Sequence, residues 1–69
     1  MSNTHRLAEA VRIACLDAAL RAYEDAGISG LCHEGRWEIA VQAIRTLDLG
    51  PVVRESQASD RSANGDRSP

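Results

Sequence analysis

Three consecutive residues, Cys32, His33 and Glu34, are of types that can bind a metal ion or take part in catalysis. A zinc site needs several such side chains to converge on one ion. Neighbouring side chains on a helix point about 100° apart, so three in a row cannot converge. The sequence holds no second pair at a zinc-finger-like spacing. We therefore predict no metal site and no bound cofactor.

A cysteine beside a histidine could also form a nucleophile and its base. Cys32 and His33 meet the same geometric objection, and no third residue stands out to orient the histidine. The other cysteine, Cys15, lies well before the predicted corner, beyond the Cα–Cα separation that a disulfide allows. The sequence thus predicts no catalytic residues, no disulfide and a protein that is not an enzyme.

A long helix is expected over residues 5–26, which lack glycine and proline and are rich in alanine, leucine and arginine. Asp17 and Arg21 have the acid-before-base spacing that stabilises a helix. At 3.6 residues per turn the apolar side chains form two stripes. The bulky stripe holds Ile13, Leu16, Leu20 and Tyr23, and the small-residue stripe holds Leu7, Val11, Ala14, Cys15, Ala18 and Ala22. A single short partner helix can cover only one of them.

Glycines divide the middle of the chain. Gly27 is suited to end the first helix in a left-handed conformation, and Ser29 can cap a short helical turn over residues 30–34. Gly35 then breaks this turn, and a second helix is expected over residues 36–49. We predict that the two helices pack antiparallel, with Trp37 buried under the corner against Leu20 and Tyr23. The predicted core and corner residues are Leu20, Tyr23, Gly35, Trp37, Val41 and Ile44.

The pair Gly50-Pro51 is expected to stop the second helix, because proline disfavours helix in the residue before it. After Val53 the chain is polar and shows no apolar period. Such a composition cannot repay the entropy of ordering. We therefore predict a helical domain over residues 1–53 and a disordered tail over residues 54–69. The predicted fold class is all-α, an antiparallel helical hairpin.

Size and charge limit the classes of function. With 69 residues and a core made largely of alanine, the chain is expected to need a partner for stability. Its net charge of −2 does not attract nucleic acid. No apolar run is long enough for a signal peptide or a membrane span, which predicts a cytoplasmic protein with reduced thiols.

Two segments carry a resemblance to known proteins. The sequences AYEDAG at residues 22–27 and GLCHEGRWE at residues 30–38 resemble a group of short bacterial helical proteins. Some of these carry the label acetyltransferase, an activity that implies a sheet and a phosphate-binding loop for which this sequence offers no segment. Residues 28–47 also resemble one hairpin of the tetratricopeptide and pentatricopeptide repeats, although no second copy follows. We interpret this second likeness as convergent hairpin packing.

The small-residue stripe is the predicted interaction face. Short side chains allow a second helix to approach closely, either from another copy in a homodimer or from a larger protein. The expected function is a small protein-interaction module or accessory subunit. A nucleic-acid-linked transcriptional regulator is the alternative, and an accessory relative of a transferase without its own active site is the third hypothesis. The residues predicted for this face are Leu7, Val11, Ala14, Ala18 and Ala22.

Overall fold

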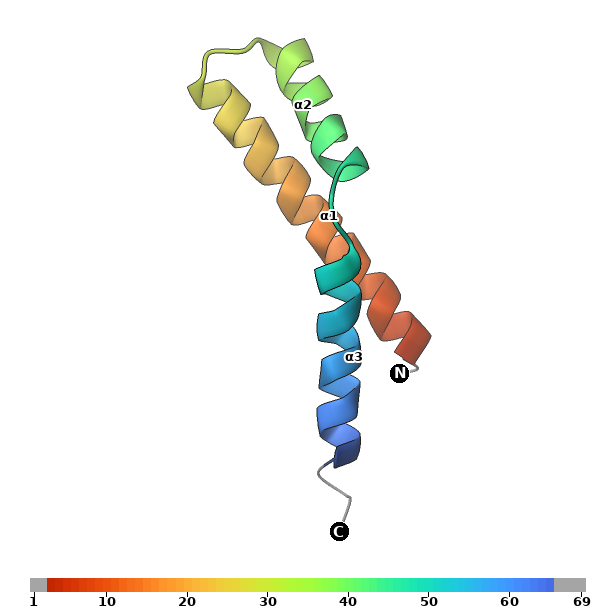
Figure 1. The fold of residues 1–69 in the computed structure, drawn as a ribbon. Helices are drawn as coiled ribbons and strands as arrows, with labels where there is room; N and C mark the ends of the chain where they lie inside the picture. Colours follow the sequence, from red (N-terminus) through yellow and green to blue (C-terminus); the bar gives the residue numbers. More distant parts are fainter. Residues whose placement is uncertain (1–2, 66–69) are drawn as a thin grey trace. The chain divides into compact units, whose positions relative to one another are not determined.

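The computed structural model describes the backbone of residues 3–65 and the side chains of residues 3–58. This part of the chain contains three helices, α1 (Asn3–Ile28), α2 (His33–Arg45) and α3 (Gly50–Gly65), joined by short non-helical segments, and no strand (Figure 1). The predicted all-α class is confirmed. None of the described helices offers an apolar stretch that would span a lipid bilayer.

The chain forms two compact units. One consists of Ile13–Leu47 and contains the C-terminal part of α1 together with α2. The other consists of Met1–Arg12 and Asp48–Pro69 and contains the beginning of α1 together with α3. The predicted domain boundary after Val53 therefore falls inside α3.

The first unit is the predicted antiparallel hairpin, in which α2 runs back along α1 (Figure 1). Helix α1 continues through Gly27 to Ile28 and closes at Gly30, where the backbone has the left-handed φ of 91°. The Gly30 N–H donates to the Gly27 carbonyl, and the Leu31 N–H donates to the Ala26 carbonyl, each at 3.0 Å. These two bonds are those of a Schellman motif with glycine at the C′ position. The helix-ending residue is thus Gly30, three positions later than predicted.

Helix α2 begins directly after this corner, so the separate turn predicted over residues 30–34 does not form. Cys32 is extended, with φ −74° and ψ 173°, and its carbonyl accepts the first helical bond from the Arg36 N–H at 2.9 Å. Gly35 lies inside the first turns of α2 rather than breaking a helix. A Cβ at position 35 would stand 3.1 Å from Leu31 Cδ2, so glycine leaves the space that the Leu31 side chain occupies.

Helix α3 begins at the Gly50-Pro51 pair that was expected only to stop a helix. The first N–H groups of a helix have no partner within it, so proline in the first turn costs no hydrogen bond. The Asp48 carboxylate accepts from the Gly50 N–H at 2.9 Å, and the Val53 N–H donates to the Leu49 carbonyl at 2.9 Å. Residues 54–65 are therefore helical, whereas residues 66–69 of the predicted tail lie outside the described residues.

The interior is formed by small side chains. Among the described residues only Ala26 and Ala40 are buried, each 6% exposed, and no large side chain is fully enclosed. Both alanines belong to the hairpin unit and lie on its two helices. In the other unit the half-buried apolar side chains include Leu7, Val11, Val52 and Val53.

Candidate interaction face of the hairpin

The three residues of metal-binding type lie at the start of α2 and do not form a common site. Cys32 is exposed and precedes the helix, Glu34 is exposed in its first turn, and His33 faces α1. Both cysteines of the chain are free thiols. Within the part of the chain that the structure describes, no group of three or more His, Cys, Asp or Glu residues is placed to hold a metal ion.

His33 and Tyr23 join the two helices beside the corner. A hydrogen bond of 3.1 Å links the Tyr23 hydroxyl and the His33 Nδ1. The Arg36 guanidinium lies 5.8 Å from the centre of the Tyr23 ring, and its Nε donates to the Leu31 carbonyl at 2.9 Å. Sequence reasoning singled out Tyr23 but missed Arg36, because no sequence period marks a side chain that folds over a corner.

The Tyr23–His33 contact establishes which residues share a face of the hairpin. Residues 16, 20 and 23 follow one another at helical spacing along α1, and residues 33, 37, 41 and 44 do so along α2. Because the two rows meet at Tyr23 and His33, they lie on the same side of the unit. We call this surface the hairpin face and define it by Leu16, Leu20, Tyr23, Trp37, Val41 and Ile44.

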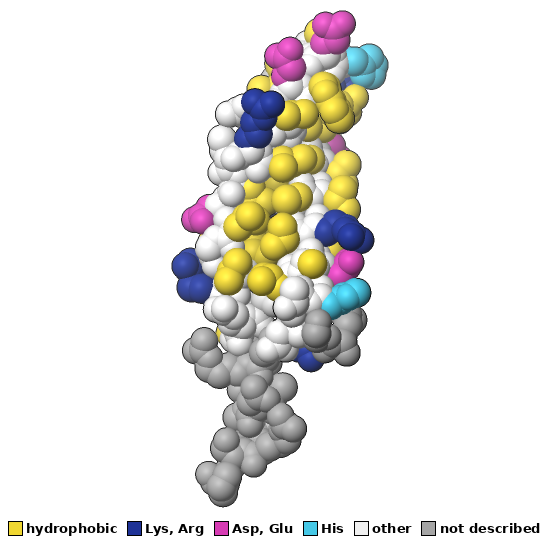
Figure 2. Space-filling model, turned by 90° about the vertical axis from the view of Figure 1, so that its right-hand side faces the viewer, with side chains coloured by type: hydrophobic (Ala, Val, Ile, Leu, Met, Phe, Trp, Pro, Cys, Tyr) yellow, Lys and Arg dark blue, Asp and Glu magenta, His cyan; other side chains and the backbone are white. Residues whose placement is uncertain are grey.

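Large apolar side chains of the hairpin face are open to solvent. Leu16 is 57% exposed, Leu20 62%, Trp37 66% and Ile44 44%, whereas Tyr23 and Val41 are half-buried. On the side of the molecule that Figure 2 draws, hydrophobic side chains reach the surface beside charged ones. The prediction that Trp37 is buried against Leu20 is therefore corrected. Both residues lie on the expected face, but within the hairpin unit neither side chain is buried.

The residues predicted for the interaction face are less exposed than the large aliphatic side chains of the bulky stripe. The five predicted residues, Leu7, Val11, Ala14, Ala18 and Ala22, are all half-buried. In the hairpin, Ala22 shares the inward side of α1 with the buried Ala26. The bulky stripe, including Ile13 at 63% exposure, is the one left open. Small side chains suit an inner seam because they allow two helix axes to approach closely.

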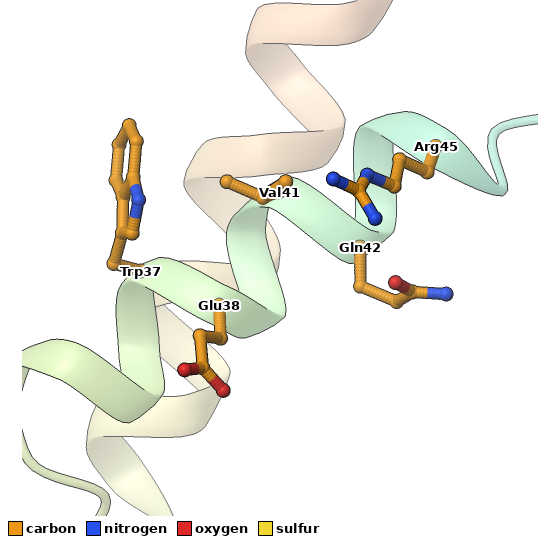
Figure 3. A pocket seen from close by; sticks show the side chains of 5 residues that line it. All are labelled: Trp37, Glu38, Val41, Gln42 and Arg45. Carbon is orange, nitrogen blue, oxygen red and sulfur yellow. The ribbon is translucent and has the colours of Figure 1, made fainter.

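A shallow hollow on α2 borders the hairpin face (Figure 3). Its lining residues are Trp37, Glu38, Val41, Gln42 and Arg45. Trp37 and Val41 point to one side of the hollow, while Glu38 and Gln42 point to the other. The Arg45 side chain turns back towards Val41. Apolar side chains and side chains of opposite charge therefore line the same part of α2.

The chain matches no protein family, no curated protein and no solved structure.

Proposed function

We propose that this chain is a small protein-interaction module, an accessory or regulatory subunit that works through the hairpin face rather than an enzyme. One observation carries the proposal: large apolar side chains from both helices are exposed together on one face of a two-helix unit. Contiguous apolar patches are uncommon on soluble proteins and usually mark a site of interaction.

The energetics of so small a chain point the same way. Burying a large apolar side chain contributes about 1.5–3 kcal/mol. The described part of the chain leaves much of this stabilisation unrealised at Leu16, Leu20 and Trp37, while its buried side chains are alanines. A partner that covers the hairpin face would supply the stabilisation that a core of this size lacks.

The charges of the hairpin favour protein over nucleic acid as the partner. A helix that reads DNA presents a basic stripe. On α2, Arg45 and Glu38 line the same hollow, and on α1 the Arg21 Nε lies 3.1 Å from the Asp17 carboxylate. We therefore keep the nucleic-acid regulator as the weaker alternative. We propose the cytoplasm as the compartment, and an accessory subunit of a transferase would use this same face.

Photo-crosslinking in cells that produce the protein tests the proposal. A photoreactive phenylalanine analogue at position 20 or 37 should give covalent adducts with a protein, identified by mass spectrometry. The same analogue at Glu24, an exposed polar position on α1 outside the hairpin face, serves as the control. The proposal fails if the face positions give no adduct, or if Glu24 gives the same adducts in equal yield.

A further inference from the structure

The hollow on α2 is lined by side chains at regular helical spacing. Trp37, Val41 and Arg45 are spaced four residues apart and so lie along one side of the helix, with Val41 at the centre (Figure 3). If a second α2 runs antiparallel with a two-fold axis at Val41, Arg45 of each copy meets Trp37 of the other. In such a two-fold contact every pairing occurs twice.

The charges along α2 fit the same arrangement. Glu34 and Glu38 lie in the N-terminal half of the helix, and Arg45 is its last residue. Neither Glu38 nor Arg45 forms an ion pair with another residue among those that the structure describes. An antiparallel copy brings the basic end of one helix to the acidic end of the other. Arg45 would then gain a carboxylate and the face of an indole ring, both favourable partners for a guanidinium.

We propose that a second copy of the chain occupies the hollow on α2. This inference rests on the function proposed above. The two α2 helices pack antiparallel about Val41, and the reciprocal contacts are Arg45 with Trp37 and Glu38. This assembly buries Trp37, the most exposed apolar residue of the hairpin face. It differs from the homodimer that the sequence predicted, which would have used the small-residue stripe of the first helix.

Charge reversal in the full-length chain tests the pairing by analytical ultracentrifugation at low ionic strength. Arg45→Glu sets two carboxylates opposite each other across the interface, and Glu38→Arg sets two guanidinium groups opposite each other. The dissociation constant of each variant's homodimer should therefore be on the order of tenfold higher than that of the wild type. An equimolar mixture of the two variants restores opposite charges and should recover an affinity within about threefold of the wild type. The double variant E38R/R45E should likewise form a homodimer.

The matched control is Arg21→Glu, which makes the same charge change at an exposed position of α1 away from the hollow. Circular dichroism confirms that each variant keeps its helix content, and rescue in the mixture is itself evidence of intact folding. A wild-type chain that stays monomeric at about 100 µM overturns the second copy but leaves the crosslinking test of a foreign partner standing. A wild-type dimer that Arg45→Glu and Arg21→Glu weaken equally, with no recovery in the mixture, overturns the proposed pairing.

Discussion

Arg36 fastens the corner of the hairpin through three contacts. Its Nε bonds the Leu31 carbonyl, its guanidinium faces the Tyr23 ring, and it packs against Gly27, where a Cβ would stand 3.1 Å from its Cζ. Glycine at position 27 thus leaves room for the Arg36 side chain, even though the helix continues through this residue.

Arg36→Ala should lower the free energy of unfolding by about 1–2 kcal/mol, since it removes a hydrogen bond and a cation–π contact. Arg36→Lys should fall in between, because an ammonium keeps the charge but not the planar donor geometry. Urea unfolding followed by circular dichroism measures both. A stability of Arg36→Ala equal to that of the wild type would show that the guanidinium contacts are not maintained in solution.

Gly30 is the residue at which backbone conformation alone restricts the side chain. Its φ of 91° is costly for any residue with a Cβ, although no atom lies within 4 Å of the place a Cβ would take. Gly30→Ala should therefore destabilise the hairpin by about 1–2 kcal/mol, and Gly30→Asn by less. Chemical denaturation compares them with Ser29→Ala, a neighbouring exposed position. Equal stabilities of Gly30→Ala and Ser29→Ala would contradict the left-handed closure.

At the scale of helices, the sequence predicted the hairpin but not its details. Helical periodicity and the absence of glycine between residues 5 and 26 were enough to predict the first helix. The sequence could not decide whether Gly27 or Gly30 ends this helix, because an apolar residue follows each of them. Periodicity also identified the two stripes of α1 without showing which one faces α2. That choice depends on how closely the axes approach, which is a tertiary property.

Helix α3 shows a second limit of composition. Residues 54–58, RESQA, contain no large apolar side chain, yet arginine, glutamate, glutamine and alanine all favour helix. A helix of these residues forms once its first turn is stabilised. Asp48 and Pro51 stabilise that first turn. The absence of an apolar period therefore placed the start of the tail at residue 54, whereas intrinsic propensity supports a helix over residues 54–58.

Asp48→Ala tests this stabilisation of the first turn. Losing the acceptor of the Gly50 N–H should cost about 1 kcal/mol and lower the helix content through fraying of α3. Asp48→Asn keeps an acceptor oxygen and should stay close to the wild type. Amide hydrogen exchange of residues 53–58 measures the effect locally, with α2 as the internal reference. Unchanged exchange in Asp48→Ala would mean that α3 does not depend on this contact.

For the molecule as a whole, the two stripes of α1 lead to opposite expectations about stability. A half-buried residue of the small-residue stripe contributes to the single chain, so its replacement should destabilise the fold at every protein concentration. A residue of the hairpin face contributes only when that face is covered, and covering it stabilises the folded state by mass action. The dependence of stability on protein concentration therefore separates the two kinds of position.

Leu20→Gln and Ala18→Gln form a matched pair for this comparison, since Leu20 is 62% exposed and Ala18 is half-buried on the same helix. At low micromolar concentration the free energy of unfolding of Leu20→Gln should lie within about 0.5 kcal/mol of the wild-type value, as is usual for surface substitutions. At high concentration the wild type should gain stability and the variant should not. Ala18→Gln should be less stable than the wild type throughout, by about 1–3 kcal/mol from overpacking. Thermal unfolding across a hundredfold range of concentration measures all three chains. If Leu20→Gln were destabilised equally at every concentration, Leu20 would be packed within the single chain, and the hairpin face would lose its role as an interaction surface.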